Sequence, residues 1–142
     1  MKFGTKEYME EVKRRTNADE KYRRMAKNDT DSYTMVLTAE PAKGIKETLV
    51  AGYSLVNGEI TETWQGERKT SFTLSGVYGV WVDVLRGALS PNKALTMRKL
   101  KVSGNILRLL KGADSTIRWV EILTTIPTEF DGDYAQYNLP GA

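Results

Sequence analysis

The sequence predicts an α+β fold in which a five-stranded, mainly antiparallel sheet is covered by helices on one face. Apolar residues alternate in several segments around the middle of the chain, which indicates strands, whereas helical spacing dominates before and after them. Most strand segments follow one another through short turns, and such connections produce antiparallel neighbours. With 142 residues the chain is long enough for one domain with a substantial core.

The first 28 residues are predicted to form a pair of helices. Apolar residues at helical spacing indicate a first helix over residues 5–15. Thr16-Asn17 should interrupt it, because either residue can cap a second helix that runs to about Lys27. The segment carries nine basic and five acidic residues. These mixed charges favour a solvated surface over a phosphate-binding one.

Four strands are predicted in the next fifty residues, and Asn57-Gly58 is their clearest turn. This dipeptide joins the second strand to the third and is a strong hairpin signal, because both turn positions need a positive φ. Pro41 is expected to stop the first strand. The predicted strands span residues 32–40, 48–56, 59–65 and 70–77.

Helical spacing returns after residue 77. A helix is expected to end at Gly87, since a residue without a Cβ suits a left-handed cap. Ser90-Pro91 begins a short helix, with Ser90 as its N-cap, and Met97 near its end is expected to face inward. Residues 98–103 (RKLKVS) alternate again and are predicted to form the fifth strand.

One long helix should close the fold. Its apolar stripe runs from Ile106 to Ile126, with a bend expected at Gly112, and Pro127 ends it. Residues 128–142 form a tail without periodicity. We therefore expect a single domain over residues 1–142, with a helix pair at one end and a tail at the other.

The sequence contains neither histidine nor cysteine. This excludes a disulfide, a thiolate nucleophile, a cysteine-ligated metal and a Ser-His-Asp triad. Asp131 and Asp133 flank a glycine but lack the other oxygen ligands of a calcium loop, so they are interpreted as a polar turn. We predict no enzymatic activity, no catalytic residue, no metal and no cofactor.

The chain is expected to be cytoplasmic. Its apolar runs are far shorter than the roughly 20 residues of a membrane-spanning helix. The charged N-terminus has no apolar segment of the kind found in secretory signals.

Residues 86–105 (RGALSPNKALTMRKLKVSGN) resemble the sterol carrier protein type 2 family. The family pattern is a helix ending in Gly, a Leu and a Pro, an Ala in a short helix, a Gly-Lys-Leu-Lys strand, and Gly-Asn before the final helix. Arg98 departs from it, because the family usually has Gly there for the tight turn into the strand. Residues 16–28 also resemble the N-terminal helices of stand-alone prokaryotic members. The matching residues are Gly87, Leu89, Pro91, Ala94, Lys99, Leu100, Lys101, Val102, Gly104 and Asn105.

The resemblance implies a non-enzymatic lipid carrier. Its ligand would be a fatty acid, fatty acyl-CoA, phospholipid or sterol-like molecule, held in an apolar tunnel between the sheet and the helices. An ordinary filled core is the alternative for the same apolar periodicity. The residues expected to contact lipid are Trp81, Leu85, Leu89, Leu95, Met97, Leu100, Leu109, Leu110, Ala113 and Ile117.

Two kinds of macromolecular partner are considered. Lys93, Arg98, Lys99 and Lys101, with the N-terminal helices, form a basic group that suits transient contact with an anionic membrane. Solvent-facing charges that protect a strand edge are the alternative. No basic-aromatic module for nucleic acid is present.

The second function class is a structural or interaction module that uses the same fold for dimerisation or partner binding. It requires exposed apolar residues in the tail, and both a monomer and a homodimer remain open. The tail residues that suit this role are Phe130, Tyr134, Tyr137 and Leu139.

Overall fold

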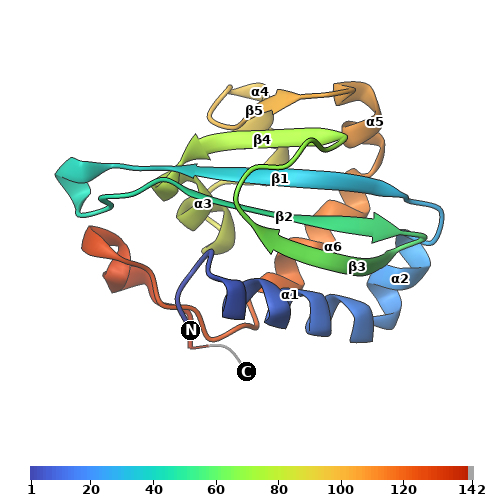
Figure 1. Cartoon of the computed structure of the whole chain (residues 1–142), viewed down its shortest axis with the longest axis horizontal. Helices are drawn as coiled ribbons and strands as arrows, with labels where there is room; N and C mark the ends of the chain where they lie inside the picture. The colour runs from blue at the N-terminus through green and yellow to red at the C-terminus, as the bar shows by residue number, and fades with distance from the viewer. Residues whose placement is uncertain (141–142) are drawn as a thin grey trace.

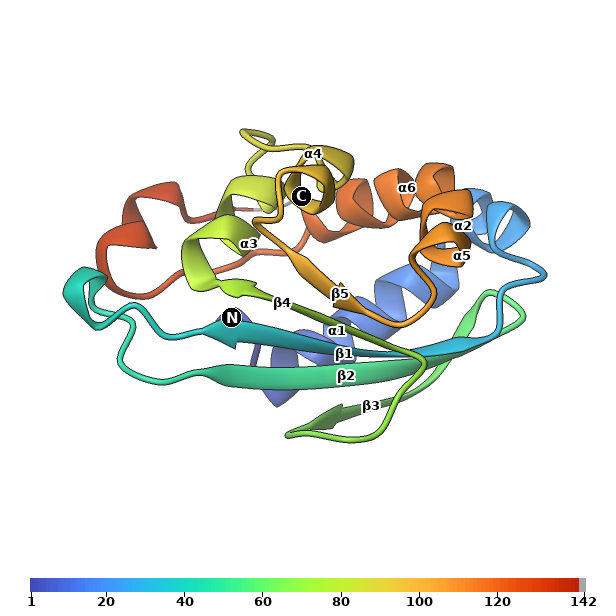
Figure 2. The same cartoon turned by 90° about the horizontal axis from the view of Figure 1, so that it is seen from above.

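A five-stranded sheet and a layer of helices on one of its faces make up the structure (Figures 1 and 2). This computed structural model describes residues 1–140. The order of strands across the sheet is β3-β2-β1-β4-β5. The predicted α+β class and the five strands are confirmed. The strands are β1 (Asp31–Thr38), β2 (Leu49–Val56), β3 (Glu59–Gln65), β4 (Phe72–Val77) and β5 (Lys101–Ser103).

One strand pair in the sheet is parallel. β1 runs antiparallel to β2, β2 to β3, and β4 to β5, whereas β1 and β4 are parallel neighbours. The predicted hairpin between β2 and β3 is confirmed, because Asn57 and Gly58 have φ values of 49° and 79°. After β3 the chain crosses to the other side of β1, so β4 does not extend the hairpin series.

Six α-helices and two short 3-10 helices complete the described part of the chain. α1 lies along β3, and the remaining α-helices cover the sheet from the same side (Figure 2). The α-helices are α1 (Lys6–Ala18), α2 (Glu20–Met25), α3 (Tyr78–Leu85), α4 (Pro91–Thr96), α5 (Ile106–Lys111) and α6 (Ala113–Leu123). The 3-10 helices are η1 (Pro41–Lys43) and η2 (Gly132–Tyr137).

The break between the N-terminal helices falls at Asp19, so the predicted interruption at Thr16-Asn17 was wrong. Thr16 is buried, and its hydroxyl accepts a hydrogen bond of 3.1 Å from Trp119 Nε1. The Asn17 side chain instead bonds both backbone groups of Ile60. Tertiary partners therefore satisfy these polar side chains within α1. Asp19 caps α2 by accepting a 2.8 Å bond from the Tyr22 N–H.

The predicted closing helix is two helices that meet at Gly112. The predicted fifth strand is also shorter, because Arg98 adopts a left-handed φ of 58° and the chain turns there. Arg98 thus makes the turn at the position where the family resemblance implies glycine. Met97, expected to face inward, is 57% exposed.

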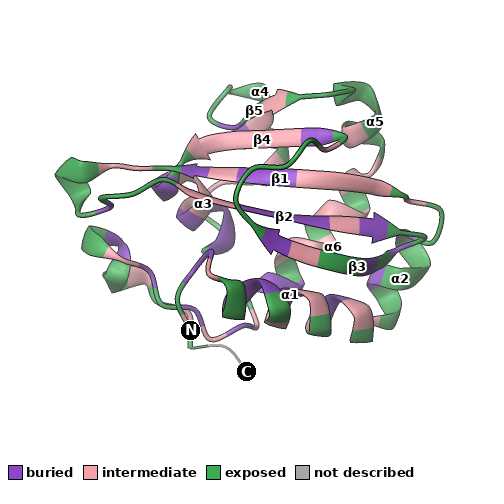
Figure 3. Cartoon of the chain, viewed as in Figure 1, coloured by how far each residue is buried: buried purple, intermediate pink, exposed green. Residues whose placement is uncertain are grey.

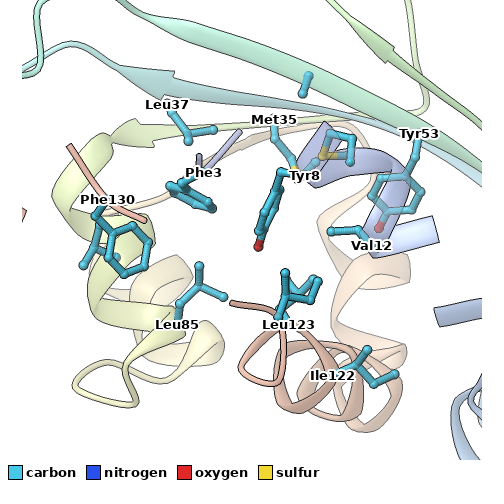
Figure 4. Packing of buried hydrophobic residues seen from close by; sticks show 14 of the residues in the cluster. Phe3, Tyr8, Val12, Met35, Leu37, Tyr53, Leu85, Ile122, Leu123 and Phe130 are labelled. Atoms are coloured by element: carbon cyan, nitrogen blue, oxygen red, sulfur yellow. The ribbon is translucent and has the colours of Figure 1, made fainter. Parts of the chain in front are cut away.

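A filled core occupies one end of the space between the layers, where α1, α3 and the C-terminal segment converge (Figures 3 and 4). Phe3 contacts Tyr8, Tyr78 and Phe130 edge to face, with ring centres 5.3 to 5.6 Å apart. Such aromatic pairs add stabilisation beyond that of buried area. Leu85 and Leu123 reach the same core from the helices (Figure 4).

The C-terminal tail belongs to this core. Phe130 is 2% and Tyr134 is 8% exposed, while Tyr137 and Leu139 pack against the core from its edge. Thr128 and Leu139 exchange backbone hydrogen bonds of 2.6 and 2.9 Å. The expectation of exposed apolar side chains at these positions was therefore wrong for Phe130 and Tyr134, which are anchors of the fold.

Candidate functional site

A cavity of about 650 Å³ lies at the other end of the space between sheet and helices. Its floor comes from β1, β2 and β4, and its walls come from α3, α4, α5 and α6. The segment from α2 to β1 and the helix α5 border it at the same end of the molecule (Figures 1 and 2).

Few fully buried side chains come from the two helices α5 and α6 above the cavity. α6 buries Ile122 and Leu123 near its C-terminus, and α5 buries no residue at all (Figure 3). Asn105 caps α5 by accepting a bond of 3.2 Å from the Arg108 N–H. The α5–α6 pair therefore extends over the sheet without filling the space below.

Six of the ten residues expected to contact lipid line this cavity, and four do not. Leu85 lies in the filled core, and Leu89 packs on a small cluster around Ala94. Met97 and Ile117 point to solvent, with 57% and 46% of their surfaces exposed. The six that line the cavity are Trp81, Leu95, Leu100, Leu109, Leu110 and Ala113.

The end of the cavity beside α3 and α4 is apolar. Met35, Leu74 and Val84 complete this wall with Trp81, Leu95 and Leu100. Trp81 Nε1 donates to the carbonyl oxygens of Val36 and Gly76 at 3.1 and 3.2 Å. Its one polar atom is therefore satisfied by the sheet, and the wall suits a hydrocarbon chain.

The opposite end of the cavity is lined by aromatic side chains that the sequence analysis did not predict, namely Tyr33, Tyr53 and Trp119. Tyr33 stacks on Tyr53 with ring centres 4.9 Å apart, and on Phe72 at 5.3 Å. These contacts follow from register, because Tyr33 faces both residues across the sheet. Trp119 of α6 packs on Tyr53 at 5.3 Å. We call these four residues the aromatic row; Tyr22 of α2 lines the cavity next to it.

Charged groups also border the cavity beside the aromatic row. Arg108 of α5 forms an ion pair with Asp31, and its guanidinium carbon lies 5.0 Å from the centre of the Phe72 ring. Burial and the nearby Asp31 raise the pKa of Asp29. Lys111 and Asp114 are the remaining charged residues of the lining. The lining thus has a polar end and an apolar end.

Burial raises the pKa of Tyr22, Tyr33 and Tyr53, and nearby hydroxyls or carboxylates raise each one further. All three hydroxyls therefore stay protonated and uncharged at neutral pH. They offer hydrogen bonds without adding charge to the cavity.

The basic residues named from the sequence lie outside the cavity lining. Lys93, Arg98, Lys99 and Lys101 are all exposed. The acidic pair in the tail has a structural partner, since Lys2 Nζ donates to Asp131 at 2.8 Å. Among residues 1–140, no group of three or more carboxylates is placed to hold a metal ion. Nor does this part of the chain contain a helix that is long and apolar enough to span a bilayer.

The profile of the SCP-2 sterol transfer family matches residues 9–113. The chain therefore belongs to the SCP-2 sterol transfer family. A search among curated proteins found no significant relative.

Solved structures show the same fold. A crystal structure of sterol carrier protein 2 superposes with a TM-score of 0.78 at 23% identity, covering 85% of this chain and 96% of the other. A conserved hypothetical protein from Thermus thermophilus, described as a candidate sterol carrier protein, gives 0.73 at 22% identity, covering 85% and 89%. A palmitated sterol carrier protein 2-like protein from Aedes aegypti gives 0.58 at 14% identity, covering 79% and 93%.

Proposed function

We propose that this protein binds one lipid molecule in the cavity between its layers and transfers it without catalysis. The carrying observation is the cavity itself, whose volume falls in the range of about 300 to 1,000 Å³ typical of small-molecule sites. The family membership and the palmitated Aedes relative support an acyl-chain ligand. The acyl chain of the ligand would lie against the apolar wall around Trp81, Leu95 and Leu100.

Burial of hydrocarbon supplies the free energy for binding. Each CH₂ group that leaves water contributes about 0.8 kcal/mol, so a C16 chain gains on the order of 10 kcal/mol before ordering costs. No covalent bond forms or breaks. Transfer then follows the equilibrium between donor membrane, protein and acceptor membrane.

We also propose that α5 is the membrane-facing element. Ile106, Leu107 and Leu110 are 46%, 71% and 37% exposed on this helix, which borders the cavity. Arg108 and Lys111 place positive charge on the same helix. Exposed apolar side chains with neighbouring cations favour the surface of an anionic bilayer.

Lipid uptake is tested by native mass spectrometry of delipidated protein titrated with fatty acids, acyl-CoA and phospholipids. Ala113→Trp should abolish lipid uptake, because Ala113 lines the cavity and an indole at this position would occupy the space of the ligand. Ala88→Trp is the matched control at an exposed position outside the lining. Absence of uptake by the unaltered protein would contradict the proposal.

A role in dimerisation or partner binding through the tail has less support, because Phe130 and Tyr134 are buried in the core. Removal of residues 128–142 should therefore unfold the protein. A folded truncated protein that no longer self-associates would instead favour the interaction role. Circular dichroism and light scattering distinguish these outcomes.

A further inference from the structure

The polar end of the cavity contains three hydroxyls that the protein leaves without partners. Tyr22 and Tyr53 are only 5% and 6% exposed, and Tyr33 is partly buried. All three side chains line the cavity. Among the described residues, no hydrogen bond reaches any of their hydroxyl groups. Among residues 1–140, the fully buried side-chain atoms without a partner belong to Tyr8 and Trp64, so the three hydroxyls at the cavity are accessible from its interior and available to a ligand.

The backbone brings these hydroxyls together. Tyr33 and Tyr53 face each other across β1 and β2, and their ring planes differ by only 22°. Their side chains therefore run side by side from the sheet towards the helices. Tyr22 approaches from α2 and lines the same cavity as Tyr33 and Tyr53.

The charges around this group do not favour an anion. Asp29, Asp31 and Asp114 line the cavity with only two cations, Arg108 and Lys111. The Arg108 guanidinium is already bound to Asp31. An anionic head group would therefore meet nearby carboxylates, and Lys111 is the one cation of the described lining outside that ion pair.

The ring faces are not arranged for a cation either. A quaternary ammonium group is held over open aromatic faces. Here Tyr33 is stacked between Tyr53 and Phe72, so both of its faces are covered. Tyr53 is further covered by Trp119. Tyr33 and Tyr53 therefore offer their hydroxyls, rather than open ring faces, to the cavity.

We infer that the hydroxyls of Tyr22, Tyr33 and Tyr53 form a head-group subsite for an uncharged hydrogen-bonding group, such as the alcohol of a lipid. This subsite rests on the proposed function, because the apolar end of the cavity must hold the hydrocarbon chain of the ligand. The ligand would lie with its head at the aromatic row and its hydrocarbon towards Trp81, Leu95 and Leu100. Each tyrosine hydroxyl can donate one hydrogen bond to such a head and accept another from it.

Four ligands with the same chain test the subsite. Isothermal titration would compare 1-dodecanol, dodecanoate, dodecyl phosphate and dodecyltrimethylammonium at neutral pH. We expect dodecanol to bind at least tenfold more tightly than either anion and the cation. Equal binding of all four, or preference for a charged head, would overturn the subsite while leaving lipid binding intact. Failure of all four to bind would overturn the proposed function as well.

Hydroxyl deletion locates the subsite. Tyr33→Phe and Tyr53→Phe keep the stacked rings and remove only the oxygen. Each should weaken dodecanol binding about fivefold, the effect of one hydrogen bond, without changing dodecyl phosphate binding. Tyr8→Phe is the matched control, because that hydroxyl is buried without a partner outside the cavity lining. Unchanged dodecanol affinity in both Tyr33→Phe and Tyr53→Phe would contradict the inference.

Discussion

The two ends of the space between sheet and helices differ in how they are filled. At the α1 end, Phe3, Tyr8 and Phe130 interlock with the sheet and the C-terminal segment. Beside the cavity, Val84, Ala94 and Leu100 form a second and much smaller cluster of buried residues near α3 and α4. The α1 end also has the N-terminal residues and the C-terminal segment to fill it.

This difference indicates that one end of the fold serves stability and the other end serves ligand binding. The N-terminus and the tail close the α1 end, with Phe3 N–H bonded to the Glu129 carbonyl at 3.1 Å. α5 has no such partner, and its main polar link to the sheet is the Arg108–Asp31 ion pair. The molecule therefore fills one end with side chains and leaves a cavity at the other.

The largest expected effect is at the filled end. Phe130→Ala removes a fully buried ring and should lower the free energy of unfolding by about 3 to 5 kcal/mol. Urea denaturation measures the loss. A cost below about 1 kcal/mol would show that the tail is not part of the core.

A smaller effect is expected where α6 is tied to the N-terminal helices. Asp19→Ala removes the cap of α2 and the partner of Arg118, so it should cost about 1 to 2 kcal/mol. Asp19→Asn keeps a capping side chain and should cost less, since it removes only the ion pair. Equal losses in the two variants would show that the cap contributes nothing.

The same carboxylate predicts a dependence of stability on pH. The hydrogen bond from Arg118 holds the pKa of Asp19 below its ordinary value. Its stabilisation is therefore complete above about pH 4, the ordinary range of an aspartate, and is lost as the pH falls through the lower folded value. Unfolding of Asp19→Asn should depend less steeply on pH in this acidic range.

At the hollow end, removal of side-chain volume should cost less. Leu95→Ala faces an existing cavity, so we expect a loss of about 1 kcal/mol, well below that of Phe130→Ala. Its main effect should be weaker lipid binding. A cost equal to that at Phe130 would mean that this end is also tightly packed.

A gain in stability is expected at Arg98. The left-handed backbone at this position costs an ordinary side chain about 1 kcal/mol more than it costs glycine. Arg98→Gly should therefore raise the free energy of unfolding by about 0.5 kcal/mol, after the entropy that glycine loses on folding. Arg98→Lys is the control and should give no gain.

The smallest effect on stability is expected at Leu107, which is 71% exposed. Leu107→Ser should change the free energy of unfolding by less than about 0.5 kcal/mol. It should nevertheless slow lipid transfer between anionic vesicles, measured by dequenching of a fluorescent fatty acid. The control Thr96→Ser, at an exposed position on α4, should leave transfer unchanged. Transfer at the unaltered rate in Leu107→Ser would exclude this residue from membrane contact.

Local signals were sufficient for much of the fold. Alternating apolar residues predicted the strands. Asn57-Gly58 predicted the hairpin, because the positive φ that the turn requires depends only on these two adjacent residues. The parallel pairing of β1 with β4 had no such signal, since it joins segments separated by two other strands. The boundary at Asp19 was missed because Thr16 and Asn17 are satisfied by distant partners, Trp119 and Ile60.

The site was less predictable than the fold. Periodicity identifies apolar faces but does not say whether the space beneath them is filled, so Leu85 in the core and Leu95 at the cavity produced the same signal. The aromatic row arises from the register of three strands, which places Tyr33 against both Tyr53 and Phe72. Tyrosines at inward positions of neighbouring strands were the only hint of it in the sequence.

The central claim is that the hollow end holds the hydrocarbon chain of a lipid. A crystal structure of delipidated protein grown with 1-dodecanol tests this most directly. The account predicts one chain of density against Trp81, Leu95 and Leu100, with its oxygen within hydrogen-bond distance of Tyr33 or Tyr53. A collapsed space filled by α5 side chains, with no ligand density, would contradict it.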